Sequence, residues 1–387
     1  MTRIFIATGG TGGHIIPARC LAQNLSRKNH QIFVFGDKKY VNYINEDDGF
    51  KSFIIISSQA FDGIFGHLKM TVKIGFGFLQ SIYYFLRFRP DFVYGFGGYA
   101  TFPILIAAII FRKKIILHEQ NSHLGKVNRL FAKFSYKIAL TFAKTDAILP
   151  EFVVKTVFTG NPVRQEILAL NQLKYTLPQE KEMKKRDKMG YDDLILAAEF
   201  DDYQEYLQNK EMLNILIIGG SGGTQIFSEI LPKVFFNLSE TIKNEIEITQ
   251  QCRQDLVEST FRDYDNFNIS VTVNHFFEDM ATEIKKAHIV IARAGSSSLA
   301  EFCVAKKPMI LIPFAKSADN HQQKNARFFE EIGAAIIIEE KDFTINKMSQ
   351  IITNLLTQNR NILFEMSNNC KKIAILDADE KLANLIA

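Results

Sequence analysis

Cysteine is scarce in this chain of 387 residues, and its few cysteines form no recognisable pattern. The four, Cys20, Cys252, Cys303 and Cys370, are widely scattered, and none belongs to a Cys-x-x-Cys pair. Disulfide frameworks and zinc ribbons need closely spaced cysteines. The sequence therefore argues against both and fits a reducing cytoplasm.

Long hydrophobic runs are also missing. The longest candidate, residues 102–111, ends at a basic stretch and is too short to cross a bilayer, so it predicts a buried helix. The first apolar run has only the length of a strand and meets glycines at once, unlike the core of a secretory signal. The sequence thus predicts neither a membrane span nor a signal.

Neither sign of charge is in large excess. The formal net charge is +4, which is too small to make nucleic acid the expected partner. Residues 61–91 nevertheless combine many aromatic side chains with several basic ones and almost no acids. This segment predicts either an interior helix or an apolar patch, ringed by basic residues, that docks on an anionic membrane surface.

Strand-length apolar runs alternate with helix-length segments through most of the chain. In the first half we predict a helix at 15–28 and strands at 3–8, 31–35, 92–94, 114–117 and 137–140. The second half predicts strands at 214–218, 245–249, 269–273, 289–292, 308–312 and 335–338. Residues 171–212, between the halves, are dense in charge and predict a solvated insertion or linker. This alternation predicts two similar α/β halves with parallel sheets, and a ligand at the carboxyl ends of their strands.

Two glycine-rich stretches occupy equivalent places in the two halves, GGTGG at 9–13 and GGSGG at 219–223. A tight turn from a strand into a helix directs several backbone N–H groups at one point, and the helix dipole adds partial positive charge. Glycine lets a phosphate or a sugar approach that backbone closely. Each loop is therefore a candidate sugar-nucleotide site, and a tight turn without a ligand is the alternative.

Other nucleotide-binding patterns fit these loops poorly. Both lack the third glycine of the dinucleotide fingerprint, and only Asp37, after the second strand, would suit the ribose of NAD. No Lys-Ser or Lys-Thr follows either loop, as a P-loop requires.

Two further patterns could suggest a metal, but neither predicts one. The histidines of HEQNSH (118–123) are five residues apart, about 140° around a helix, so a polar loop after a strand is the better interpretation. Asp377 and Asp379 resemble a metal-binding pair, but they are predicted on the solvated face of a terminal helix.

His14 follows the first glycine loop directly, at a predicted helix start where few other side chains can reach a ligand. An imidazole with an ordinary pKa of about 6.5 suits a general base. Packing or capping is the alternative role. Two later segments carry polar groups after predicted strands, ARAGSSSLAE (292–301) and PFAKSADNHQQKNA (313–326). The first suits a phosphate and ribose, with helix capping as its alternative. The second suits sugar hydroxyls, with a plain polar loop as its alternative.

Together these motifs resemble the MurG-type glycosyltransferases. The matching stretches, in the order of that family, are GGTGGHIIPA (9–18), GFGGYATFP (95–103), HEQN (118–121), GNPVR (160–164), GGSGG (219–223), FFEDM (276–280), ARAGSSSLAE and DNHQQKNA (319–326). The resemblance implies a GT-B fold of two Rossmann-like domains with parallel sheets facing across a cleft. It also implies an inverting transfer of N-acetylglucosamine from UDP-N-acetylglucosamine to lipid I, undecaprenyl-pyrophosphoryl-muramyl-pentapeptide, which gives lipid II.

The resemblance also assigns roles to residues. Donor contacts would come from Thr11, Gly12, Gly13, Asn121, Arg164, Ser221, Phe277, Ser296, Ser297, Ser298, Glu301 and Gln322. The acceptor pyrophosphate would meet Gly97, Gly98 and Tyr99. No cofactor or metal is implied. The enzyme would act in peptidoglycan synthesis, and so in cell shape and division, as a peripheral protein on the cytoplasmic face of the bacterial inner membrane.

The same resemblance divides the chain. Residues 1–164 would form the acceptor and membrane-associated domain, 165–212 a charged linker or insertion, 213–365 the donor-binding domain, and 366–387 a C-terminal helix that crosses back. Departures from the family pattern are GGSGGT where GGSQGA is usual, Phe277 in place of an aliphatic residue, and QQCR (250–253) in place of His-Gln-x-Gly. Two other functions remain open: a UDP-N-acetylglucosamine epimerase of the same fold, and a non-catalytic module that binds lipid pyrophosphate.

Overall fold

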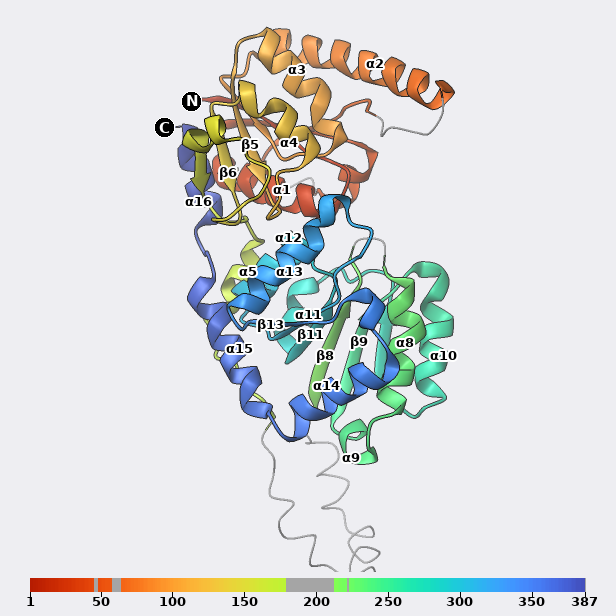
Figure 1. Cartoon of the computed structure of the whole chain (residues 1–387). Helices are drawn as coiled ribbons and strands as arrows, with labels where there is room; N and C mark the ends of the chain where they lie inside the picture. The colour runs from red at the N-terminus through yellow and green to blue at the C-terminus, as the bar shows by residue number, and fades with distance from the viewer. Residues whose placement is uncertain (45–47, 58–63, 179–211, 221–222, 387) are drawn as a thin grey trace, which may run out of the picture. The chain divides into compact units, whose positions relative to one another are not determined.

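The computed structural model describes residues 1–44, 48–57, 64–178, 212–220 and 223–386, and Figure 1 shows their helices and strands. Two parallel sheets carry the fold of these residues. The chain divides into two compact units. The first comprises Met1–Leu173, Ala292–Glu340 and Met366–Ala387, and the second comprises Lys174–Ile291 and Lys341–Glu365.

The first sheet has the strand order β3-β2-β1-β4-β5-β6-β7, and every neighbouring pair is parallel. Its strands are β1 (Arg3–Ala7), β2 (Gln31–Gly36), β3 (Lys51–Ile54), β4 (Phe92–Gly95), β5 (Lys114–Glu119), β6 (Lys137–Leu140) and β7 (Thr156–Phe158). The helices are α1 (Gly12–Arg27), α2 (Ile64–Phe88), α3 (Phe102–Ile110), α4 (Lys126–Phe131) and α5 (Gln165–Leu170). The order reverses between β1 and β4, so the loops after these two strands flank the point where such sheets bind ligands.

Successive side chains of β1 point to opposite faces of the sheet, and each face carries a hydrophobic core. Phe5 points to the face that α2 and α3 cover, where its ring lies 5.0 Å from that of Phe85 and 4.6 Å from that of Phe35. Ile4 and Ile6 point to the opposite face, which α1 covers. Burial on both faces explains why these strands read as nearly continuous apolar runs in the sequence.

The C-terminal helices are α15 (Arg360–Ile373) and α16 (Ala378–Ala383), and α16 packs against α1. The Tyr94 hydroxyl donates to the Leu382 carbonyl at 2.8 Å, and the Leu382 side chain is fully buried. Asp379 is also buried and accepts a 2.8 Å hydrogen bond from the Asn24 side chain. The prediction of a solvated face was therefore wrong for Asp379, because its partner lies on a helix far away in the sequence.

The second sheet has the order β10-β9-β8-β11-β12-β13, which repeats the order of the first six strands of the other sheet. Its strands are β8 (Leu213–Ile218), β9 (Ile246–Gln251), β10 (Val271–Asn274), β11 (Ile289–Ala292), β12 (Met309–Leu311) and β13 (Ala335–Ile337). The helices are α8 (Gln225–Phe236), α9 (Glu240–Lys243), α10 (Val257–Asp265), α11 (Met280–Lys286), α12 (Ser296–Val304), α13 (His321–Glu331) and α14 (Ile345–Thr357). The repeated order confirms the prediction of two Rossmann-like sheets.

All eleven predicted strands are present, and so is the buried helix predicted at 102–111, which is α3. Two short strands, β3 and β7, were not predicted; both lie at edges of the first sheet, where fewer side chains are buried. Most of the predicted charged insertion, residues 179–211, lies outside the described residues. Among the helices that the structure describes, none is long and apolar enough to cross a membrane.

The packing of α16 on α1 predicts a large destabilisation when Leu382 is shortened. Because the side chain is fully buried in the core cluster of α1, Leu382→Ala should lower the free energy of unfolding by about 2–5 kcal/mol. Urea denaturation measures this change. Leu376→Ala is the control, because that side chain is 45% exposed and should change stability by at most about 0.5 kcal/mol. Equal losses in both variants would contradict the packing described.

Candidate functional site

The two glycine loops that follow β1 and β4 touch each other. Gly9 has a φ of +146°, and a Cβ there would lie 2.6 Å from the Ala100 Cβ. Gly98 has a φ of +78°, and a Cβ there would lie 2.7 Å from the Gly9 carbonyl oxygen. Side chains are therefore excluded on steric grounds, and two stretches of bare backbone meet at the switch point of the sheet.

Asp37 ties these two loops together from the end of β2. Its carboxylate accepts a 3.0 Å hydrogen bond from the Gly10 N–H and a 2.6 Å hydrogen bond from the Tyr99 hydroxyl. Burial raises the pKa of Tyr99 to about 12, and both its hydrogen bond to Asp37 and the negative charge of Asp37 contribute. The hydroxyl therefore keeps its proton and stays a donor. The residue that could have suited an NAD ribose is thus engaged inside the protein.

His14 lies in the first turn of α1, against the second glycine loop. Cβ atoms added to Gly97 and Gly98 would lie 3.4 Å from its Cε1 and 3.5 Å from its Cδ2, respectively. The His14 Nδ1 is 2.8 Å from the Gln120 Oε1. The candidate base therefore stands beside both loops, and Gln120 fixes the orientation of its ring.

A chain of hydrogen bonds behind His14 determines which ring nitrogen carries the proton. Burial lowers the pKa of His118 to about 4, so this ring is neutral near pH 7. Its Nε2 lies 3.1 Å from the Gly160 carbonyl oxygen, which can only accept, so the N–H of His118 is on Nε2. The Gln120 amide then donates to the His118 Nδ1 at 3.0 Å, and Gln120 Oε1 accepts from His14. This arrangement protonates His14 on Nδ1 and leaves the lone pair on Nε2.

Glu119, the last residue of β5, organises the loop that follows it. Its buried carboxylate accepts hydrogen bonds from the backbone N–H groups of Asn121 and Gly125, at 3.0 and 2.8 Å. The side-chain amides of Asn121 and Asn128 also donate to it, at 3.1 and 2.8 Å. Four donors compensate for the cost of burying this charge. The predicted polar loop therefore begins only after His118 and Glu119, which belong to the strand.

Asn325 on α13 connects that loop to the segment before α12. Its Oδ1 accepts from the Ser122 N–H at 2.9 Å and from the Ser122 hydroxyl at 3.0 Å. Its Nδ2 donates to the Asn121 Oδ1 at 3.1 Å and to the Ala294 carbonyl at 3.2 Å. Asn325 is fully buried, and together with the Glu119 carboxylate it fixes the position of Asn121.

The start of α12 also meets the first glycine loop. Gly295 caps the helix without a side-chain hydrogen bond, so the three serines occupy the first turn and none of them is the cap. The Ser297 hydroxyl donates to the Gly13 carbonyl at 2.8 Å and accepts from the Asn161 amide at 3.2 Å. Ser296 is likewise buried, whereas Ser298 is half-buried.

Arg164 and Glu301 form a two-pronged ion pair. The Arg164 Nε and Nη2 donate to the two carboxylate oxygens of Glu301, at 2.7 and 2.8 Å. Burial alone would lower the pKa of Arg164, but the charge and hydrogen bonds of Glu301 outweigh it and raise that pKa. The pair uses Nε and Nη2, which leaves the two N–H groups of Nη1 outside it.

The remaining predicted residues make other contacts, belong to the second unit or lie outside the described part. The Gln322 Oε1, at the start of α13, accepts a 3.0 Å hydrogen bond from the Phe314 N–H, which shapes the loop after β12. Phe277 is half-buried after β10, in the second unit. Ser221 lies outside the described residues.

Four polar residues at the site were missed as individual contributors: Glu119, Gln120, Asn161 and Asn325. Each lies inside a motif that had been singled out. Gln120, Asn161 and Asn325 depend on partners far away in the sequence, whereas Glu119 depends on donors that follow it closely. Chemically, the first unit combines an oriented imidazole, two helix starts with backbone N–H groups and one arginine nitrogen. That set can remove a proton and stabilise an anion.

Two family models together match most of the chain. Residues 4–140 match the glycosyltransferase family 28 N-terminal domain, and residues 214–382 match its C-terminal domain. The chain is 33% identical over 384 residues to a protein of Wolbachia pipientis subsp. Culex pipiens (strain wPip), covering 99% of this chain and 98% of that one. That relative is named UDP-N-acetylglucosamine--N-acetylmuramyl-(pentapeptide) pyrophosphoryl-undecaprenol N-acetylglucosamine transferase.

A second relative and a solved structure extend the likeness. A protein of the same name from Paramagnetospirillum magneticum (strain ATCC 700264 / AMB-1) is 33% identical, covering 99% of this chain and 95% of its own. The crystal structure of Acinetobacter baumannii MurG superposes with a TM-score of 0.71 at 25% identity, covering 100% of this chain and 99% of that one. Both match over nearly their whole length.

The neutral state of His118 predicts a pH dependence of stability. Its pKa of about 4 in the folded protein lies below the ordinary value of about 6.5, so the unfolded chain takes up the proton first as the pH falls. Stability from this group is complete above about pH 6.5 and is lost as the pH falls towards 4. Between pH 7 and pH 5 the loss should be about 2 kcal/mol.

The measurement is urea denaturation at both pH values for the wild type and for His118→Asn. The variant should lack this part of the pH dependence, whatever its stability at pH 7. His275→Asn, which changes an exposed histidine, is the control and should keep the wild-type dependence. If His118→Asn lost as much stability on acidification as the wild type, the assignment of a neutral His118 would be wrong.

Proposed function

We infer that this protein, which belongs to the MurG-type transferases of glycosyltransferase family 28, transfers N-acetylglucosamine from UDP-N-acetylglucosamine to lipid I and so forms lipid II. The protein is thus a UDP-N-acetylglucosamine-dependent hexosyltransferase of peptidoglycan synthesis, and through that pathway it would serve cell shape and division. The observation that supports this chemistry best is the single protonation state that the buried hydrogen bonds impose on His14.

In the proposed reaction, the 4-hydroxyl of the acceptor sugar attacks the anomeric carbon of the donor. The His14 Nε2 accepts the hydroxyl proton while the new carbon–oxygen bond forms and the bond to the UDP oxygen breaks. Attack from the face opposite to UDP inverts the anomeric carbon. A neutral imidazole can do this because Gln120 accepts from its Nδ1 and leaves Nε2 unprotonated.

The departing UDP gains negative charge, and the site offers donors for it. The backbone of Thr11, Gly12 and Gly13 begins α1, and Ser296, Ser297 and Ser298 begin α12; both are helix starts that favour anions. We propose these six as contacts to the donor diphosphate, together with the Nη1 of Arg164. Preorganised donors of this kind stabilise charge that develops in the transition state.

Further residues would contact the ribose, the sugar, the uracil and the diphosphate of the donor. Glu301 would accept from the ribose hydroxyls, since carboxylate oxygens can accept more than the single hydrogen bond that Arg164 gives each of them. Asn121 and Gln322 would contact the donor sugar, and Phe277 would hold uracil through its backbone. Ser221 would contact the nucleotide diphosphate.

The second glycine loop would hold the acceptor. We propose that Gly97, Gly98 and Tyr99 bind the pyrophosphate of lipid I through their backbone, because the Tyr99 hydroxyl is engaged with Asp37. The chain would be organised as residues 1–164 for the acceptor and 213–365 for the donor, joined by 165–212 and completed by the helix in 366–387. No metal is needed in this scheme, since the donors are backbone and arginine N–H groups.

A transfer assay tests the function directly. Radiolabelled UDP-N-acetylglucosamine and a lipid I analogue, without divalent metal, should give labelled lipid II. Absence of transfer by the wild type would contradict the proposal. Conversion of the donor alone to an epimer would favour the epimerase instead.

His14→Ala tests the base. The variant should lose about 10²- to 10⁴-fold in kcat, because proton removal by a positioned group contributes that much, and its affinity for UDP should be unchanged. His30→Ala is the control, since this histidine lies beyond the opposite end of α1 and should not affect kcat. Full activity of His14→Ala would remove the assignment.

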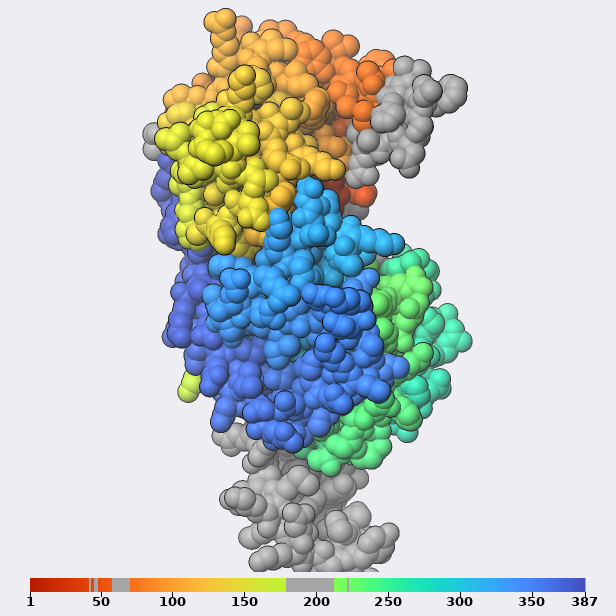
Figure 2. Space-filling model, viewed as in Figure 1, coloured from red at the N-terminus to blue at the C-terminus, as the bar shows by residue number. Residues whose placement is uncertain are grey.

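We also propose that α2 docks on the cytoplasmic face of an anionic membrane. Every third or fourth residue along it is apolar and at least half exposed: Val72, Phe76, Leu79, Tyr83 and Leu86. This spacing forms one stripe on a helix, and α2 lies at the surface in Figure 2. The exposed Arg87 and Arg89 lie at the end of the same helix, where they would meet acidic headgroups. Residues 61–91 also contain His67 and Lys69, whose side chains lie outside the part of the chain that the structure describes.

Sedimentation with lipid vesicles tests the stripe. Wild-type protein should bind vesicles that contain phosphatidylglycerol and bind pure phosphatidylcholine vesicles much less, because the headgroup charge adds to apolar burial. Phe76→Glu with Leu79→Glu should abolish this binding. Phe261→Glu changes an exposed aromatic residue on α10, in the second unit, and should leave binding intact. Unchanged binding by the α2 variant would refute the proposal.

A further inference from the structure

The loop before α13 has an unusual backbone. Asp319 and Asn320 both have positive φ values, +52° and +53°, in two consecutive residues that are not glycine. Asp and Asn tolerate the left-handed conformation better than other non-glycine residues, but two in succession are uncommon. These two residues lie immediately before His321, the first residue of α13, so their conformation sets how the helix begins.

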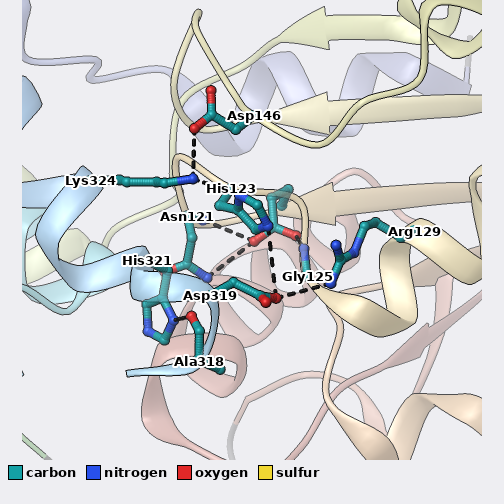
Figure 3. A network of polar contacts seen from close by, with 10 residues as sticks. Asn121, His123, Gly125, Arg129, Asp146, Ala318, Asp319, His321 and Lys324 are labelled. Carbon is teal, nitrogen blue, oxygen red and sulfur yellow. Dashed lines mark hydrogen bonds and ion pairs between the residues drawn. The ribbon is translucent and has the colours of Figure 1, made fainter. Parts of the chain in front are cut away.

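Contacts from α4 and from the loop after β5 hold this loop in place, as Figure 3 shows. The Arg129 Nη2 donates to the Asp319 Oδ2 at 3.0 Å, and the His123 Nε2 lies 3.8 Å from the same oxygen. Arg129 belongs to α4, and His123 lies in the loop that follows β5. Thus two residues from other elements converge on the carboxylate of a residue in the left-handed conformation.

A second contact holds α13 one turn further on. The Lys324 Nζ lies 2.7 Å from the Asp146 Oδ2 and donates to the His123 Nδ1 at 3.0 Å (Figure 3). The lysine cation and its hydrogen bond lower the pKa of Asp146, which favours the charged pair. Because Lys324 donates to Nδ1, the proton of a neutral His123 is on Nε2, the nitrogen nearer Asp319. One chain of contacts therefore joins Arg129, Asp319, His123, Lys324 and Asp146, and it is here called the α13 clamp.

The α13 clamp encloses residues that the proposed function uses. Gln322 lies between Asp319 and Lys324 in the sequence, and Asn325 follows Lys324 directly. Asn325 is bonded to Asn121, in the same loop as His123. A shift of the first turn of α13 would therefore move Gln322 relative to Asn121, and both are proposed contacts of the donor sugar.

We propose that Asp319 and Lys324 are positioning residues for the sugar part of the donor. They touch no substrate themselves; they fix the first turn of α13, and with it Gln322, at a set place relative to Asn121. Ion pairs as exposed as these contribute little to folding stability, so their main effect is on geometry. The inference rests on the proposed function, since it assumes that these two amides meet N-acetylglucosamine.

Calorimetric titration with two ligands, UDP-N-acetylglucosamine and UDP, tests the proposal on the full chain. Asp319→Asn keeps the size of the side chain and tolerates a positive φ, but it loses the charge that Arg129 pairs with. Lys324→Gln removes the other contact. Each variant should bind UDP-N-acetylglucosamine roughly five- to tenfold more weakly and bind UDP within about twofold of the wild type.

Two controls separate this role from a general loss of structure. Arg327→Gln changes an ion-paired arginine on the same helix that binds Glu330 and Glu339, outside the clamp, and should change neither affinity. The swapped pair Asp146→Lys with Lys324→Asp should recover most of the affinity that Lys324→Gln loses. Thermal unfolding of each variant should stay close to that of the wild type.

The outcomes are distinguishable. If the wild type failed to bind UDP-N-acetylglucosamine, the proposed function itself would fall, and this inference with it. If the wild type bound both ligands but the clamp variants matched it, only the positioning role would be overturned. Equal weakening for UDP and UDP-N-acetylglucosamine would also overturn that role, because it would show a disturbance that is not confined to the sugar.

Discussion

The hydrogen-bonded chain from Gly160 through His118 and Gln120 to His14 is the interaction on which the proposed chemistry of this protein depends. It works because its far end is a backbone carbonyl, which can only accept, and because burial keeps His118 neutral. In each hydrogen bond of the chain, only one of the two groups can then be the donor. The proposed base, His14, is thereby held in the tautomer that can accept a proton on Nε2.

The glycine loops serve this arrangement in a second way. Gly9 and Gly98 pack so closely that neither could carry a side chain, and Asp37 holds both loops through Gly10 and Tyr99. The same backbone that could approach a phosphate is therefore also rigidly placed. Rigid placement matters for a site of this kind, because donors that must reorganise during a reaction stabilise the transition state less.

The fold could be predicted from the sequence more completely than the site. Parallel strands buried on both faces give continuous apolar runs such as residues 3–7 and 213–218, and glycines mark the turns that follow them. The edge strands β3 and β7 carry no such signal. For the site, the glycine loops, His14 and the motifs were visible. Pairings across the chain were not visible, because Arg164 meets a partner 137 residues away and Ser122 meets one 203 residues away.

The position of α16 has a consequence for the order in which the protein is made. Leu382 and Ala383 complete the core that α1, near the beginning of the chain, shares with β1 and β4. During synthesis the first sheet would thus wait for a segment that the ribosome delivers long after the sheet itself has emerged. Until then one apolar side of α1 stays uncovered, which makes the nascent first unit a natural client for chaperones that bind exposed apolar surface.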